Sequence, residues 1–254
     1  MKITFLGTGT SQGIPMIGCT CNVCQSVDYR DQRLRSSIHI QNENDSIVID
    51  SGPDFRQQIL RARIKTLDAV LFTHEHKDHV AGLDDVRGFN YSQNRPMQVY
   101  AHQRVLNHIK EREFYYAFGE FKYPGAPELE VNEIKNAPFK IKNTEFIPIE
   151  VLHYRLPVFG FRIKNFTYIT DASFISDIEI EKIKGSEIVV LNGLQKEAHI
   201  SHFTLQQSIE MLNKIAPKRA YLTHISHKLG LHRIVQKELP EGVELSYDGL
   251  EIIV

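Results

Sequence analysis

Four side chains that can bind a metal ion lie within six residues, directly after the apolar run Leu67–Phe72. The segment 73–79 reads Thr-His-Glu-His-Lys-Asp-His, and its four candidate ligands are His74, His76, Asp78 and His79. Because side chains alternate along a strand, His74 and His76 leave its end on the same side. Imidazole and carboxylate groups suit Zn, Mn or Fe ions. The segment therefore predicts a metal site just beyond the carboxyl end of a strand.

The rest of the chain alternates short apolar runs with amphipathic stretches, which is typical of mixed α/β folds. The predicted strands are Lys2–Leu6, Ser36–Gln41, Ser46–Asp50, Leu67–Thr73, Met97–Ala101, Glu145–Leu152, Val158–Ile163, Phe166–Thr170, Glu187–Leu191, Arg219–Thr223 and Leu250–Val254. The predicted helices are Asp54–Ala62, Asp78–Arg87, His102–Phe114, Asp177–Ile183, Thr204–Lys214 and His232–Glu238. We expect an α/β fold in which two mixed sheets pack face to face with helices outside, as one domain over residues 1–254.

Charge and hydropathy narrow the classes of partner. The formal net charge is −1, which argues against a basic nucleic-acid footprint and against a polybasic membrane anchor. No apolar run approaches the roughly 18 residues of a membrane-spanning helix. The first residues, MKITFLGTGTSQG, read as a strand entering a glycine-rich turn and not as a signal peptide. We therefore expect a cytoplasmic protein that binds neither nucleic acid nor membrane.

The three cysteines of the chain all lie between positions 19 and 24. Cys19, Cys21 and Cys24 cannot all pair within one chain, so a disulfide framework is disfavoured. Three thiolates could bind a tetrahedral zinc ion whose fourth ligand is a His or Cys from elsewhere. His227 is the candidate, since it follows the predicted strand Arg219–Thr223. The alternative is a set of reduced thiols without a ligand.

The His-x-His-x-Asp-His pattern after a hydrophobic strand resembles the metallo-β-lactamase superfamily, whose fold is the αββα sandwich expected above. Later ligands of that family have matching positions just past apolar runs, namely His153, Asp171 and His224. The resemblance implies one ion held by His74, His76 and His153. It implies a second ion held by Asp78, His79 and His224, with Asp171 bridging the two ions. It also implies that Asp50 orients the metal loop.

The cysteine segment resembles the PhnP-type phosphodiesterases of the carbon–phosphorus lyase pathway. In that group a cysteine-rich loop binds a structural zinc ion together with a histidine three residues after the last catalytic ligand, which is the place of His227 relative to His224. The group also has a histidine upstream that protonates the leaving group. His202 matches it best and His199 is the competing choice. The alternative is that either histidine only caps the helix predicted from Thr204.

The resemblance implies a hydrolase with two divalent ions, Zn or Mn, at its catalytic site and one structural Zn. Two such ions can share a water molecule and lower its pKa. The bridging hydroxide would attack a small or cyclic phosphodiester, Asp78 would help to hold the ions, and His202 would act as general acid. The alternatives are a lactonase or thioesterase of the same superfamily and a non-catalytic metal-binding scaffold. Relatives in the family also suggest a homodimer.

The aromatic segment Lys110–Pro127 has two interpretations. Its Phe and Tyr side chains could pack a helix end into the core, as buried aromatics usually do. They could instead form a lid over a substrate pocket. The sequence alone leaves both open.

Overall fold

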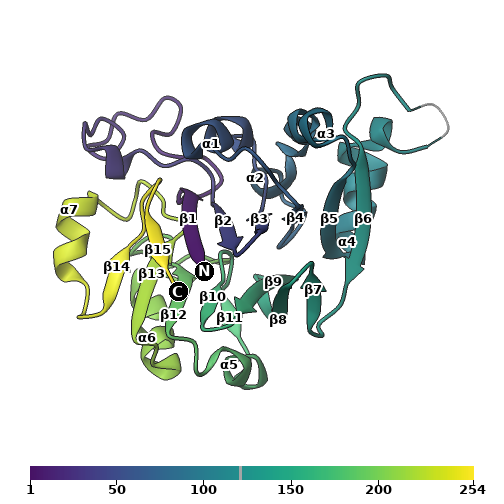
Figure 1. Cartoon of the computed structure of the whole chain (residues 1–254). Coiled ribbons are helices and arrows are strands. Elements are labelled where there is room, and N and C mark those ends of the chain that lie inside the picture. Colours follow the sequence, from purple (N-terminus) through teal and green to yellow (C-terminus); the bar gives the residue numbers. More distant parts are fainter. Residues whose placement is uncertain (120–121) are drawn as a thin grey trace.

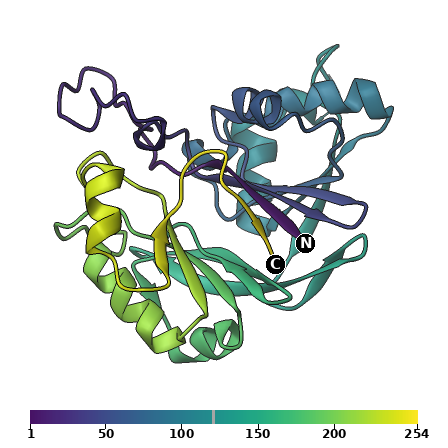
Figure 2. The same ribbon diagram turned by 60° about the vertical axis from the view of Figure 1, so that its left-hand side comes forward.

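Two mixed β-sheets face each other in this computed structural model, and helices cover the outer side of each sheet (Figures 1 and 2). The structure describes residues 1–119 and 122–254. Among these residues, no helix has both the length and the apolar character needed to cross a membrane. The expected αββα sandwich is confirmed.

The first sheet has the strand order β15–β1–β2–β3–β4–β5–β6. Its strands are β1 (Lys2–Gly7), β2 (Ser37–Asn42), β3 (Asp45–Ile49), β4 (Ala69–Leu71), β5 (Met97–His102), β6 (Leu129–Ile134) and β15 (Glu251–Ile253). Strands β3 to β6 are parallel neighbours, so β3, β4 and β5 deliver the residues that follow them to the same edge of the sheet.

The second sheet has the order β11–β8–β9–β10–β12–β13–β14, with β7 paired to β8. Its strands are β7 (Phe139–Ile141), β8 (Thr144–His153), β9 (Leu156–Ile163), β10 (Phe166–Tyr168), β11 (Phe174–Ile175), β12 (Ile188–Asn192), β13 (Arg219–Thr223) and β14 (Val243–Leu245). Strands β10, β12 and β13 are parallel, which brings their carboxyl ends together.

The helices divide between the two outer faces. On the first sheet lie α1 (Phe55–Ala62), α2 (Lys77–Val80), α3 (Arg87–Gln93) and α4 (Gln103–His108). On the second lie α5 (Asp177–Ile183), α6 (Leu205–Ile215) and α7 (His232–Val235). Short 3-10 turns are η1 (Tyr29–Asp31), η2 (Leu83–Val86), η4 (Tyr115–Ala117) and η5 (Gln236–Glu238), and η3 (Ile109–Glu113) is a π-helical turn.

Alternating side chains build three apolar layers from these elements. In β3, Ile47 and Ile49 face the second sheet, whereas Val48 lies under α1 with Phe55 and Ile59. Because both faces of the strand are covered, it reads as a continuous apolar run. Helix α6 begins with a capping box, in which the Thr204 hydroxyl accepts from the Gln207 N–H and the Gln207 side chain accepts from the Thr204 N–H.

The helix predicted over Asp78–Arg87 is wrong as a single element. The segment instead forms helix α2, a break at Gly82, the turn η2, and then helix α3 from Arg87. A Cβ at Gly82 would lie 2.0 Å from the Gly52 carbonyl oxygen, and the Gly82 N–H instead donates to the Ser51 carbonyl at 2.8 Å. This close approach of the loop after β3 interrupts the helix. The helix predicted over His102–Phe114 likewise changes to a π turn after His108.

Four short strands, β6, β7, β11 and β14, were not predicted. Strand β6 carries Glu and Asn between its apolar residues and lies half-exposed at the edge of its sheet. Strands β7, β11 and β14 are two or three residues long, so they show no periodicity to detect.

In the aromatic segment Lys110–Pro127, Phe114 and Ala117 are buried, whereas Tyr115 and Tyr123 are exposed. Phe121 falls outside the described residues. Packing of part of the segment into the core is therefore observed, and its use as a lid stays a prediction.

The two ends of the chain pair with each other. The Met1 amino group donates to the Val254 carbonyl at 2.9 Å, and the Val254 N–H donates to the Met1 carbonyl at 2.8 Å. Figure 1 shows both ends side by side. They lie where β1 begins, at the edge of the first sheet opposite to the carboxyl ends of β1, β3 and β4.

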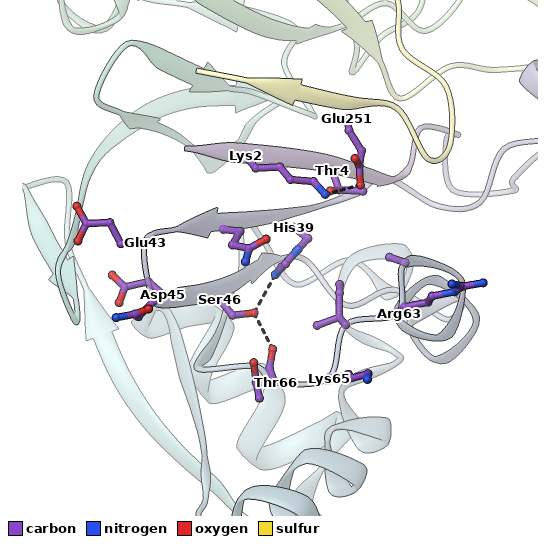
Figure 3. Close-up of a pocket in the computed structure, with 14 residues that line it drawn as sticks. Lys2, Thr4, His39, Glu43, Asp45, Ser46, Arg63, Lys65, Thr66 and Glu251 are labelled. Carbon is purple, nitrogen blue, oxygen red and sulfur yellow. Dashed lines mark hydrogen bonds and ion pairs between the residues drawn. The ribbon is translucent and has the colours of Figure 1, made fainter.

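A polar hollow of about 340 Å³ lies near the same end (Figure 3). On its floor the Ser46 hydroxyl donates to the Thr66 carbonyl at 2.7 Å and accepts from His39 Nε2 at 2.8 Å. Burial and the charge of Lys2 lower the pKa of His39 to about 4. The imidazole is therefore neutral at pH 7.

We expect His39 to make folding sensitive to acid. Its folded pKa of about 4 lies below the ordinary value of 6.5, so the unfolded chain binds more protons between these pH values and stability falls as pH drops through that window. Between pH 7 and pH 5, the free energy of unfolding of the metal-free wild type should fall by about 2 kcal/mol more than that of His39→Gln, whose amide can still donate to Ser46. Urea denaturation at the two pH values measures both. Equal losses would contradict this assignment.

Candidate metal centre

The candidate ligands gather where strands of both sheets end. Segment 73–79 follows β4, His153 ends β8, and Asp171 and His224 follow β10 and β13. Strand ends of one sheet therefore meet strand ends of the other along a single edge of the sandwich.

Ligand-type atoms at this edge form four groups within which all atoms lie within 4.8 Å of one another. The groups are His74 with His76 and His153, Asp78 with His79 and His224, His74 with His79 and Asp171, and His153 with Asp171 and His202. All seven ligands expected from the sequence are thus brought together. Asp171 contacts the Asp78, His79 and His224 group directly, since it lies 3.4 Å from His79 Nε2 through Oδ2 and 3.2 Å from His224 Nε2 through Oδ1. It also lies within 4.8 Å of ligand atoms of His74 and His153.

Three of the imidazoles are oriented in the same way. Nδ1 of His79 donates to Asp50 Oδ2 at 2.7 Å, and Nδ1 of His153 donates to the Ser201 carbonyl at 2.8 Å. Nδ1 of His74 lies 3.0 Å from the hydroxyl oxygen of Thr73, whose proton is donated to Asp50. With the ring proton held on Nδ1, Nε2 can offer its lone pair to a cation. His79, whose pKa is raised in the metal-free chain, would give up its Nε2 proton when a cation binds.

Asp50 holds the loop that carries these histidines. Its backbone has a φ of 64°, a left-handed conformation that Asp adopts more readily than most residues. Its carboxylate accepts from the Thr73 N–H and hydroxyl, both at 2.9 Å, and from His79. A Cβ at Gly52 would lie 2.0 Å from the Asp78 carbonyl oxygen, so glycine is needed where the Asp50 loop presses on α2.

The electrostatics of the cluster favour a bound cation. Although burial opposes it, the charges of His79 and His224 hold the pKa of Asp78 and of Asp171 well below the usual range. Burial also opposes charge on His79, yet Asp78, Asp171 and Asp50 raise its pKa well above the ordinary value. Among the described residues, Nε2 of His79, Oδ2 of Asp171 and Nε2 of His224 are buried without a hydrogen-bond partner. Buried carboxylates and unpaired lone pairs of this kind fit divalent metal ions.

His202 and His199 differ in position. His202 is 7% exposed, its ring lies 4.7 Å from that of His224, and its Nδ1 lies 3.8 Å from Asp171 Oδ1. Burial and the charge of His224 lower its pKa to about 2. His199 is exposed and lies outside the cluster of candidate ligands, with its ring 5.2 Å from that of His202. His202 is thus the histidine that reaches the metal cluster.

The cysteine segment forms a second cluster beside the first. Cys19, Cys21, Cys24 and His227 offer ligand atoms that all lie within 4.8 Å of one another. The sulfurs of Cys19 and Cys21 each lie 3.4 Å from His227 Nδ1. The hydrogen bond with His227 lowers the pKa of the Cys21 thiol to about 6, whereas burial raises that of Cys24 to about 11. Three sulfurs and an imidazole at these distances fit a tetrahedral zinc ion.

Two supporting groups were missed by the sequence analysis. Thr73 could have been suspected, because its hydroxyl stands at the strand end beside the first ligand. The Ser201 carbonyl that orients His153 has no sequence signal, since every residue has a carbonyl and only the folded chain places this one.

A family model described as "Beta-lactamase superfamily domain" matches residues 45–225. The chain is also 42% identical over 257 residues to a protein named octanoyltransferase from Porphyromonas gingivalis. That match covers 100% of this chain and 52% of the relative, so the chain spans about half the length of this curated relative.

Two solved structures are similar over nearly the whole chain. One is described as a new diphosphatase from the PhnP family, with a TM-score of 0.93 and 37% identity over 99% of this chain and 96% of that one. The other is Zn(2+)-bound PqqB from Methylobacterium extorquens, with a TM-score of 0.82 and 19% identity over 100% of both chains. At that identity the second likeness shows the fold alone.

We expect Asp50→Asn to lower the stability of the metal-free chain by about 3 kcal/mol, because it removes one partner of a buried charge pair. Asn tolerates the left-handed backbone, so the loss reports on the contacts to Thr73 and His79 and not on strain. Urea denaturation at pH 7 measures it. An unchanged midpoint and slope would show that Asp50 does not hold the loop.

Proposed function

Because the chain belongs to the β-lactamase superfamily, we propose that it is a metal-dependent phosphodiesterase that cleaves a small or cyclic phosphodiester. One observation carries the choice of phosphorus chemistry. It is the Cys19, Cys21, Cys24 and His227 cluster beside the seven-ligand cluster, in a chain that is 37% identical over nearly its full length to a PhnP-family diphosphatase. Thioesterases and lactonases are expected to share the seven ligands, so these do not discriminate.

A second candidate is hydrolysis of an acyl ester or thioester. The relative named octanoyltransferase favours it, because acyl groups are that protein's named substrate. This chain matches about half of that relative, and the name does not say which half carries the transferase. We therefore rank the phosphodiesterase first.

Two divalent ions, Zn or Mn, are assigned to the cluster. His74, His76 and His153 would hold one ion, Asp78, His79 and His224 the other, and Asp171 would contact both. Such ions supply positive charge to the oxygens of a phosphoryl group and lower the pKa of water. The protein's own contribution is to orient these ligands, with Asp50 holding His79 and the Ser201 carbonyl holding His153.

We assign to His202 the donation of a proton to the leaving group. Its pKa of about 2 keeps it neutral in the free chain, because it is buried beside His224. A bound phosphodiester would bring negative charge against the ring, and an adjacent negative charge raises the pKa of an imidazole. This upward shift in pKa is the direction that a general acid requires.

The second cluster is assigned a structural zinc ion held by Cys19, Cys21, Cys24 and His227. His227 follows His224 by three residues, so the ion would fix the segment that carries a ligand of the catalytic pair. The lowered pKa of Cys21 favours the thiolate that zinc requires.

We expect turnover of bis(p-nitrophenyl) phosphate with added Mn²⁺, and much less with a lactam, lactone or thioester panel. His202→Ala should lower kcat by about 10²–10⁴-fold while the metal content stays at the wild-type level. His199→Ala, which removes the exposed neighbour, is the matched control and should change kcat far less. Wild-type activity on the thioester alone would support the second candidate, and full activity of His202→Ala would remove the assigned role.

Cys21→Ser should lose one zinc ion per chain and keep the two catalytic ions, because only the thiolate cluster is altered. Its melting temperature should fall, since binding to the folded chain alone contributes stability. Metal content by elemental analysis, with Ser26→Ala as a nearby control, measures the change. Unchanged zinc stoichiometry would overturn the structural site.

A further inference from the structure

One partly buried ion pair joins the two segments that carry the first group of ligands. Glu75 stands between His74 and His76, and its Oε1 accepts from Arg104 Nε at 2.7 Å. The other end of the same guanidinium, Nη2, donates to the Pro157 carbonyl at 2.6 Å. Arg104 therefore contacts the metal loop of the first sheet and the β8–β9 hairpin of the second.

Pro157 lies beside the third ligand of that group. In the β8–β9 ladder it pairs with Leu152, and the next pair is His153 with Leu156. The side chain of Arg104 thus spans from the loop of His74 and His76 to the hairpin that carries His153. Planar guanidinium groups suit this role, since their donors point in fixed, divergent directions.

The pair is partly shielded from water. The side chain of Glu75 is 16% exposed and that of Arg104 is 34% exposed. Among the described residues, Glu75 Oε2 is buried without a partner, so Arg104 supplies the near neutralising charge. Arg104 is itself held at the start of α4, where its N–H donates to His102 Nδ1 at 3.2 Å.

The second group of ligands has a different connection between the sheets. Beside His224, the Ile225 N–H donates to the Thr8 carbonyl at 2.9 Å and the Ile225 carbonyl accepts from Thr10 at 3.0 Å. Backbone hydrogen bonds therefore fix that half of the edge. In the first half the matching backbone contact is a single bond, from the Phe159 N–H to the Thr73 carbonyl at 3.2 Å.

We propose that Arg104 is a positioning residue for one ion only, the one assigned to His74, His76 and His153. It acts through Glu75 and Pro157 and touches neither substrate nor reacting atoms. This inference rests on the proposed two-metal site. If this is right, changing Arg104 weakens the binding of one ion more than that of the other. A general loss of stability would not produce this difference.

The test is calorimetric titration of the metal-free chain with Mn²⁺, which thiolates bind weakly, so that the cysteine cluster does not contribute. Arg104→Gln should weaken one of two uptake steps by about tenfold or more, in the range seen when groups supporting a metal ligand are removed. His76→Ala identifies that step, since it deletes a ligand of the same group. Arg104→Lys keeps a charge beside Glu75 and should recover part of the loss.

Arg95→Gln is the matched control. Arg95 also joins a carboxylate to a backbone carbonyl, Asp68 at 2.6 Å and Leu67 at 3.4 Å, but at the opposite end of β4. It should leave both uptake steps within about twofold of wild type.

Three outcomes would overturn the proposal. They are unchanged uptake by Arg104→Gln, equal weakening of both steps, and weakening of the step that His76→Ala leaves intact. A wild-type chain that takes up no Mn²⁺ or Zn²⁺ at this edge would overturn the proposed function as well. Two normal steps in the wild type with no effect of Arg104→Gln would overturn the positioning role alone.

Discussion

The structure is organised around buried lone pairs that face one another and that only a positive charge can satisfy. Asp171 and the Nε2 atoms of His79 and His224 are buried within a few ångströms of one another, and the carboxylate of Asp78 beside them is mostly buried. Such groups are costly to bury without a cation. In the chain without ions, His79 supplies that charge by retaining its proton. The same site is therefore prepared for divalent ions and held together without them.

This constraint explains why the edge needs both sheets. Strands β3 and β4 bring Asp50 and the loop 73–79, whereas β8, β10 and β13 bring the remaining ligands. Each sheet alone would present an incomplete set. The two sheets pack through apolar faces that include Phe5, Ile49 and Tyr168. This packing sets the distance between the ligands that come from one sheet and those that come from the other.

The sequence was informative where chemistry and periodicity coincide. The loop 73–79 follows an apolar strand, so its ligands and their common direction could be predicted, and the fold class followed from the same alternation. The break at Gly82 could not be predicted, because it results from contact with Gly52, which is distant in sequence. The Ser201 carbonyl and the Arg104 bridge were missed for the same reason. Both are contacts between segments that are distant along the chain, and a single sequence does not show which distant segments come together.

The pairing of Met1 with Val254 has a consequence for how such a fold can be combined with others. Both chain ends lie where β1 begins, opposite to the carboxyl ends of β3 and β4, after which Asp50 and the loop 73–79 follow. A second module tethered to either end would therefore lie on the side of the sandwich away from the candidate ligands. The match with the octanoyltransferase of Porphyromonas gingivalis covers 52% of that protein, so that relative has further residues outside the matched part. Fusion at these ends would keep the added module away from the strand ends that carry the candidate ligands.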